Sequence, residues 1–64
     1  MKLSQAIING RFHAGRMSQE ELAARVHVTR QTIGKIENEK TEPSWSLVKL
    51  IATVLGISLD SLTL

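Results

Sequence analysis

The absence of cysteine is the feature that most constrains how a chain of only 64 residues can fold. Neither disulfides nor thiolate metal sites can hold this chain together, so its fold has to come from packing, with oligomerisation as a possible help. A chain of this length forms one small domain, residues 1–64, and buries only about 60% of the surface that it exposes when unfolded. Its hydrophobic share of 42% is nevertheless too high for a disordered chain.

The distribution of apolar and reactive residues excludes further classes of protein. No apolar run is long enough to cross a membrane, and no apolar segment near the N-terminus marks a signal peptide, so the expected location is cytoplasmic. Two isolated histidines, His13 and His27, and six carboxylates leave little room for a catalytic or metal-binding cluster. We therefore expect no enzymatic activity, no metal and no cofactor.

Charge is distributed unevenly along the chain, although the net charge is only +2. Residues 1–35 contain six Lys or Arg and two Glu, a balance of +4, whereas residues 36–64 contain two Lys and four Asp or Glu, a balance of −2. A positive field on one side of a molecule attracts anions. The pattern is compatible with a chance imbalance on a solvated surface, and also with an anionic partner that meets the first half.

Helix signals dominate the sequence, and two short helices are expected in its middle. Ser18 begins the pattern Ser-Gln-Glu-Glu of a capping box, in which the hydroxyl bonds a free amide and Glu21 bonds back. The helix that follows spans 19–26. After a tight turn, Thr29 has the properties of an N-cap for a second short helix that spans 29–37.

A first helix precedes this pair. Ser4 is its expected cap, and its apolar residues are Ile7, Ile8 and Phe12, of which Ile8 and Phe12, four residues apart, share one face. Gly15 is its expected end.

A fourth helix has the most regular apolar pattern in the chain. It follows Pro43-Ser44 and ends at Gly56. Its expected face has the i, i+3, i+4, i+7 spacing, in Leu47, Leu50, Ile51 and Val54, and is widened by Trp45, Val48, Ala52 and Leu55. Ser58 is expected to cap a last short turn with Leu59 and Leu62. The sequence thus predicts a compact all-α domain of five short helices.

The helix at 29–37 has an outer face that the core does not need. Ile33 and Ile36 point inward, whereas Arg30, Gln31 and Lys35 lie away from that apolar line. Arg can pair with guanine O6 and N7, and Gln with adenine N6 and N7, and a helix fits the major groove of B-DNA. The two short helices are therefore a candidate DNA-reading unit; the alternative is a plain polar surface helix.

From Met17 onward the chain resembles the phage Cro and lambda-repressor-like helix-turn-helix family. The resemblance rests on the continuous stretch 17–38, MSQEELAARVHVTRQTIGKIEN, on Pro43-Ser44, and on the segment 56–60, GISLD. It implies a five-helix lambda-repressor-like domain with the helix-turn-helix at helices 2 and 3. It also implies binding to the major groove of double-stranded DNA, usually as a symmetric dimer.

The resemblance also implies roles for individual positions. Gln19 matches the residue at the start of helix 2 that holds a phosphate and braces the recognition helix. The base-reading positions match Arg30, Gln31 and Lys35. Eight residues are thus expected at the DNA: Gln19, Thr29, Arg30, Gln31, Thr32, Lys35, Asn38 and Lys40. The matching core positions are Leu22, Ala23, Val28, Ile33 and Ile36.

Three residues depart from the pattern of the family. His27 stands where the family usually has Gly, in a turn that needs a positive φ. Gly34 lies in the middle of the recognition helix, where a side chain commonly contacts DNA, so it should loosen the helix and remove one contact. Glu39 replaces a frequent Gly after Asn38.

The first helix matches the pattern of the family least well. In the family, an arginine of this helix pairs with an acid at the position of Glu37 and lies five residues before the residue matched to Met17. Here that position is Phe12, and Arg11 is one residue early. One extra loop residue, Arg16 after Gly15, restores the match, and we favour this register over an uninterrupted one.

These patterns are interpreted as a sequence-specific transcriptional regulator, most readily a repressor that binds a palindromic operator as a homodimer. The apolar tail formed by Ile57, Leu59, Leu62 and Leu64 favours a dimer, because one copy would leave it exposed. The alternatives are the antitoxin of a toxin–antitoxin pair, which uses the same domain, and a helical protein-interaction module without DNA binding. No small-molecule ligand and no membrane contact are expected, and Trp45 fits the core or the edge of a dimer.

Overall fold

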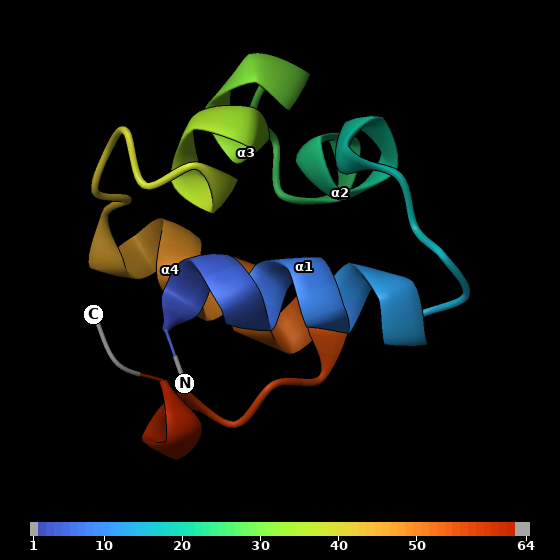
Figure 1. Cartoon of the computed structure of the whole chain (residues 1–64), viewed down its shortest axis with the longest axis vertical. Coiled ribbons are helices and arrows are strands. Elements are labelled where there is room, and N and C mark those ends of the chain that lie inside the picture. The colour runs from blue at the N-terminus through green and yellow to red at the C-terminus, as the bar shows by residue number, and fades with distance from the viewer. Residues whose placement is uncertain (1, 63–64) are drawn as a thin grey trace.

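The computed structural model describes residues 2–62 of the chain. Within them lie four α-helices and one short 3-10 turn: α1 (Leu3–His13), α2 (Gln19–Arg25), α3 (Arg30–Glu37), α4 (Trp45–Leu55) and η1 (Leu59–Ser61) (Figure 1). The domain is all-α, but the prediction of five helices is wrong. None of the helices in this part of the chain has the length and apolarity that a bilayer crossing needs.

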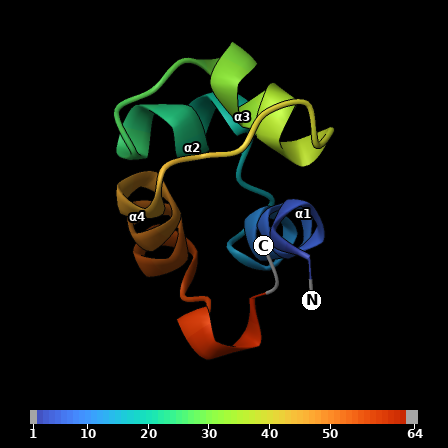
Figure 2. The ribbon, with the colours of Figure 1, turned by 90° about the vertical axis from the view of Figure 1, so that its left-hand side faces the viewer.

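The four helices enclose one core. Figures 1 and 2 show α2 and α3 as a pair above α1 and α4, with the segment after α4 passing beneath them. The largest fully buried side chains come from every one of these helices and from the end of α2: Ile7, Leu22, Val26, Ile33, Val48 and Ile51. The α2–α3 pair therefore rests on a base that α1 and α4 form.

Two predicted helix caps, Ser18 and Thr29, are confirmed, and Ser44, after which the fourth helix was expected to begin, caps α4 in the same way. The hydroxyls of Ser18, Thr29 and Ser44 each accept a hydrogen bond from the backbone amide three residues on, at 2.9, 3.2 and 3.2 Å. Each bond satisfies an amide that the first turn of a helix leaves unpaired, and such a cap typically contributes about 1 kcal/mol. The starts of α2, α3 and α4 thus follow from local side-chain chemistry.

Glu21 does not complete the predicted capping box. Its Oε2 accepts a hydrogen bond of 2.8 Å from Arg25 Nη2, one turn further along α2. Glu followed by a cation four residues on is a favourable pair on an exposed helix face. The start of α2 is therefore capped by Ser18 alone.

The first helix begins earlier than predicted. Lys2 is its N-cap, without a capping bond from the side chain, and Ser4 lies buried within the helix. Gly15, with φ 81°, follows the C-cap Ala14, so the predicted end of the helix is confirmed.

Of the three apolar residues expected on α1, Ile7 alone is buried, and the face shared by Ile8 and Phe12 is not the one that meets the core. Leu3, Ala6 and Ile7 are buried, whereas Ile8 is 37% and Phe12 63% exposed. Ile7 and Arg11 are four residues apart and therefore share one face of α1, and Arg11 bonds to Glu37 of α3. Because this face meets the rest of the protein, Phe12, the residue after Arg11, points outward. The apolar pair at 8 and 12 is thus a surface feature.

The buried face of α4 is rotated from the predicted one. Val48, Ile51 and Ala52 are buried, while Leu50 remains 45% exposed. In a helix with apolar residues on most sides, the spacing alone fits more than one face. Packing of α1 and α2 against α4 selects the face centred on Val48 and Ile51.

The segment after α4 is too short to form the predicted fifth helix. Gly56 has φ 69° and ends α4, as expected. The next turn has three residues, closed by a bond of 3.2 Å from the Leu62 amide to the Leu59 carbonyl. Starting an α-helix fixes several residues for one bond, so a short segment gains little by it. Packing fixes this segment instead, because Leu62 lies against the core; Leu64 lies outside the described residues.

Candidate nucleic-acid interface

The turn between α2 and α3 is built on one left-handed residue. His27 has φ 62°, a conformation that residues other than Gly adopt at a cost. The amide of Val28 bonds to the Ala23 carbonyl at 2.9 Å, which closes the end of α2, and Val28 packs against the core. The expectation of a positive φ at position 27 is confirmed, and the turn forms with His in place of Gly.

Glu39 ends α3 in the same way. It has φ 59°, and the amide of Lys40 bonds to the Lys35 carbonyl at 2.8 Å. This bond, with a left-handed residue between its ends, is the Schellman motif, which normally uses Gly. Position 39 therefore keeps the conformation of the Gly that it replaces, and the loop leaves α3 at a defined angle.

Glu37, the last residue of α3, joins α3 to α1. Its carboxylate oxygens accept hydrogen bonds from Arg11 Nε at 2.7 Å and Arg11 Nη2 at 3.1 Å, and Arg11 Nη1 donates to the Met17 carbonyl at 2.8 Å. The Glu37 side chain is 6% exposed and that of Arg11 18%. A carboxylate this buried requires such partners. The predicted Arg11–Glu37 pair, and with it the extra residue after Gly15, is confirmed.

Gln19 bonds to the same carboxylate. Its Nε2 donates to Glu37 Oε1 at 2.8 Å. Because Gln19 is the first residue of α2 and Glu37 the last of α3, this bond fixes the two helices to each other. The bracing geometry implied for Gln19 is thus present. The Met17 carbonyl, a further anchor, could not be found from the sequence because every residue carries that group.

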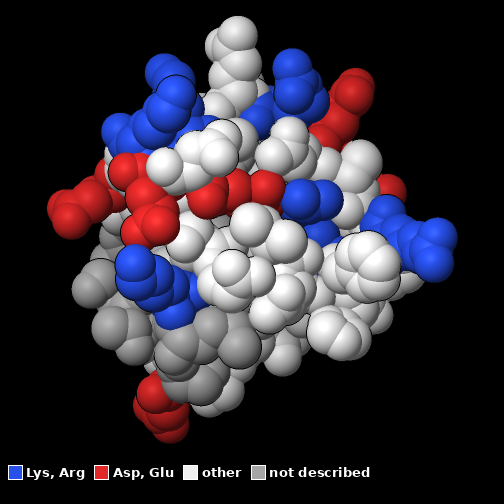
Figure 3. All heavy atoms as spheres, in the orientation of Figure 1, with Lys and Arg blue, Asp and Glu red and all other residues white. Residues whose placement is uncertain are grey.

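The outer face of α3 contrasts with this bonded inner end. Arg30, Gln31 and Lys35 are exposed, and within residues 2–62 their side chains form neither an ion pair nor a hydrogen bond. On the opposite side, Ile33 and Ile36 are 0% and 3% exposed. In Figure 3, Lys and Arg side chains stand along the edge that α2 and α3 form in Figure 1, with acidic side chains beside and below them. One side of α3 is therefore packed into the core, and the side chains on the other side are free to contact a ligand.

Three further residues that the sequence places at the DNA form hydrogen bonds within the protein, at the ends of α3. Thr29 Oγ1 accepts from the Thr32 amide, and the two threonine hydroxyls lie 3.0 Å apart. At the other end, Asn38 Nδ2 donates to the Gly34 carbonyl at 2.9 Å. Thr29 and Asn38 are exposed and Thr32 is half-buried. These residues frame the outer face of α3 while they cap its ends.

Ion pairs determine where positive charge remains uncompensated. Three cations have a carboxylate partner, namely Lys2, Arg11 and Arg25. In the part of the chain that the structure describes, those without one are Arg16, Arg30, Lys35, Lys40 and Lys49. Three of these five lie on α3 or in the loop after it, and Arg16 lies over the Phe12 ring, 5.5 Å from its centroid. Free positive charge thus gathers at the candidate interface.

Two short helices in contact, a tight turn, and a second helix with a free outer face define a helix-turn-helix unit. A helix-turn-helix family model matches residues 14–62, which is more than half of the chain. The chain belongs to the Cro/C1-type helix-turn-helix family, as the sequence resemblance implied.

The chain is also similar to an uncharacterized HTH-type transcriptional regulator of Methanothermobacter thermautotrophicus. The two are 52% identical over 40 residues, which cover 62% of this chain and 58% of the relative. The chain thus spans less than two thirds of the length of that relative. No solved structure matches the chain.

Proposed function

We propose that this chain is a sequence-specific DNA-binding transcriptional regulator without enzymatic activity, located in the cytoplasm with the DNA that it binds. Membership of the helix-turn-helix family supports the DNA-binding class, and the relative carries the name of a transcriptional regulator. The observation that carries the proposal is the division of α3. Its inner side is bonded into the fold, and its outer side presents Arg30, Gln31 and Lys35 without partners in the described residues.

In the proposed complex, α3 lies in the major groove. Arg30 and Gln31, in its first turn, enter first and read base edges, and Lys35 follows one turn later. Lys40, exposed in the loop beyond α3, meets the phosphate backbone. Gln19 uses one amide hydrogen for Glu37 and has a second for a phosphate.

Thr29, Thr32 and Asn38 have a supporting role in this complex. Hydroxyl and amide groups commonly donate to phosphate oxygens, and such contacts set the register of a protein on the duplex. These side chains lie at both ends of the outer face of α3. They are placed to hold the helix in the groove while Arg30 and Gln31 read the bases.

The proposal includes repression, a palindromic operator and a homodimer. One recognition helix reads few base pairs, and a twofold dimer doubles the site, with half-sites about 34 Å apart on one side of the DNA. A bound dimer can repress by covering a promoter, which requires no further contact.

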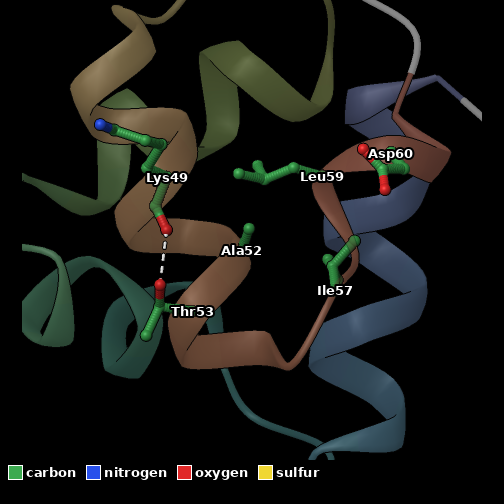
Figure 4. Close-up of a pocket in the computed structure, with 6 residues that line it drawn as sticks. All are labelled: Lys49, Ala52, Thr53, Ile57, Leu59 and Asp60. Atoms are coloured by element: carbon green, nitrogen blue, oxygen red, sulfur yellow. Dashed lines mark hydrogen bonds between the residues drawn. The ribbon is translucent and has the colours of Figure 1, made fainter.

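The dimer surface is proposed at the C-terminal side of α4. Leu59 is 38% exposed and points from η1 toward α4 across an open pocket, whose lining residues are Lys49, Ala52, Thr53, Ile57, Leu59 and Asp60 (Figure 4). Trp45, at the start of α4, is 52% exposed and therefore is not a core residue. Ile57 and Leu62 are half-buried, so the apolar tail supports a dimer less strongly than the sequence suggested.

The experiment that tests the DNA-binding proposal is selection from a pool of randomised duplexes, followed by titration of the recovered consensus, here called the selected duplex. The wild-type chain should enrich a palindrome, and its affinity should fall steeply with salt because phosphate contacts release counterions. Failure to enrich any sequence, with no salt-dependent binding, would favour the protein-interaction module instead.

Sedimentation tests the dimer separately. The expected result is a dimer, alone or on the selected duplex, that Leu59→Asp converts to a monomer without loss of helical content. A chain that sediments as a monomer in both conditions at micromolar concentration contradicts the dimer and leaves the DNA-binding proposal in place.

A further inference from the structure

Gly34 is a half-buried residue in the middle of α3, on the side that carries Arg30 and Gln31. It lies four residues after Arg30 and three after Gln31, and Asn38 follows one turn later, so all three lie around it on the helix surface. A glycine in the interior of a helix weakens that helix, so the presence of glycine at position 34 needs an explanation.

The structure gives no conformational or packing reason for Gly34. Among the four glycines, Gly15 and Gly56 have left-handed φ values, and a Cβ on Gly10 would lie 3.0 Å from Leu55 Cδ1. Gly34 has ordinary helical φ, and a Cβ built there meets no atom within 4 Å. The Asn38 side chain, which bonds to the Gly34 carbonyl, would therefore not be displaced by an added methyl group.

The remaining property of Gly34 is the open space above it. A helix with side chains is about 10–12 Å across and the major groove about 12 Å wide, so side chains decide how deeply the helix enters. At a glycine the backbone itself can approach a ligand. Arg30 and Gln31 on either side would then reach further down the base edges.

The chemistry of the space selects what can occupy it. The Gly34 carbonyl already accepts hydrogen bonds from the amide of Asn38 at 3.0 Å and from its side chain at 2.9 Å. A polar base group facing this surface would lose its water without gaining a partner, which is unfavourable. The major-groove group that loses nothing there is the C5-methyl of thymine, which favours apolar contact.

We propose that Gly34 is a specificity-determining residue: a space of one methyl group on α3 that receives the C5-methyl of a thymine in each half-site. This inference rests on the proposed DNA-binding function and replaces the idea that Gly34 merely removes a contact. Added carbon at position 34 should push α3 outward and weaken reading by the residues beside it.

The test compares Gly34→Ala with the wild-type chain on the selected duplex and on a scrambled duplex. Because Ala is the better helix former, the variant should raise the midpoint of thermal unfolding by about 3–8 °C. It should nevertheless bind the selected duplex about tenfold or more weakly, and the scrambled duplex equally well. Gln5→Ala, which places a better helix former at an exposed position of α1, is the control that should leave both affinities unchanged.

Replacing single thymines of the selected duplex by deoxyuridine identifies the methyl group. One position per half-site should weaken the wild-type chain by severalfold and leave Gly34→Ala unaffected. Equal binding of the selected duplex by both chains overturns the inference, and so does the lack of any thymine with this coupled effect. If the wild-type chain selects no sequence at all, it is the proposed function that fails.

Discussion

The two sides of α3 differ in the contacts that their side chains make. The inner side places Ile33 and Ile36 in the core and ends in Glu37, a carboxylate with hydrogen bonds from α1 and α2. The outer side presents Arg30 and Gln31, with no partner in residues 2–62. If the proposed function is correct, stability and DNA recognition are separated across one helix of eight residues. Changes on the inner side should alter the free energy of unfolding, and changes on the outer side the affinity for DNA.

The largest effect is expected on the inner side, at Glu37. Glu37→Ala leaves the guanidinium of Arg11 largely buried without its carboxylate, and breaking such a pair costs about 3 kcal/mol or somewhat more, at the low end because Arg11 is partly exposed. The free energy of unfolding of a domain of this size is about 3–10 kcal/mol in total. Urea unfolding should therefore find the variant largely unfolded or close to it.

The double variant Arg11→Met with Glu37→Met is the control for this prediction. It removes both charges and keeps apolar volume, so it should recover part of the lost stability, less what is lost because Gln19 and the Met17 carbonyl each lose a hydrogen-bond partner. If the single variant Glu37→Ala has the same urea midpoint of unfolding as the wild-type chain, the carboxylate does not stabilise the inner side of α3.

The next largest effect is expected on the outer side. Arg30→Ala and Gln31→Ala should each cost about 1–3 kcal/mol of binding to the selected duplex and relax base preference at particular positions. Since both side chains are exposed, the free energy of unfolding should change by no more than about 0.5 kcal/mol. Equal weakening on selected and scrambled duplexes would place these residues on phosphates instead.

Lys40 tests the contribution of positive charge to DNA affinity separately from the recognition of bases. Lys40→Ala should weaken binding to selected and scrambled duplexes alike and lower the salt slope by about one unit, as expected for one phosphate contact. Arg16→Ala removes a cation that also lacks a carboxylate partner within residues 2–62, from the loop after α1, and is the matched control, with an unchanged slope. Altered base preference in Lys40→Ala would contradict the proposed docking.

The smallest effect is expected at the turn that carries α3. His27→Gly relieves a left-handed conformation that costs about 1–2 kcal/mol but adds the entropy of glycine, so the net gain should be about 0.5 kcal/mol. Ala24→Gly, at an exposed position inside α2, should instead lose about 1 kcal/mol. Thermal unfolding measures both, and a loss of stability in His27→Gly would show that the imidazole makes a favourable contribution there.

Local chemistry explains which parts of the fold the sequence could predict. The caps at Ser18, Thr29 and Ser44 bond to amides three residues away, so neighbouring residues suffice to define them. The left-handed turn at His27 was predicted from the family pattern, and so was the Arg11–Glu37 pair, which joins positions 26 apart.

Tertiary packing explains what the sequence could not predict. Phe12 and Leu50 have the correct spacing for the core, yet both face solvent, because neighbouring helices select another face of α1 and α4. Glu21 could bond to the Ser18 amide or to Arg25, and propensity alone does not decide between them. The expected fifth helix is a single turn, since Leu62 is held by the core rather than by helical hydrogen bonds.

The bonds at Glu37 also have a consequence for the thermodynamics of association. Because α1, α2 and α3 meet at one carboxylate, the orientation of α3 is set when the chain folds, before any ligand arrives. In the proposed complex, what remains to be ordered on binding is mainly the rotamers of Arg30, Gln31 and Lys35, at about 0.5–1.5 kcal/mol each. The proposed interface is therefore preorganised in its backbone, and only its side chains have to adjust.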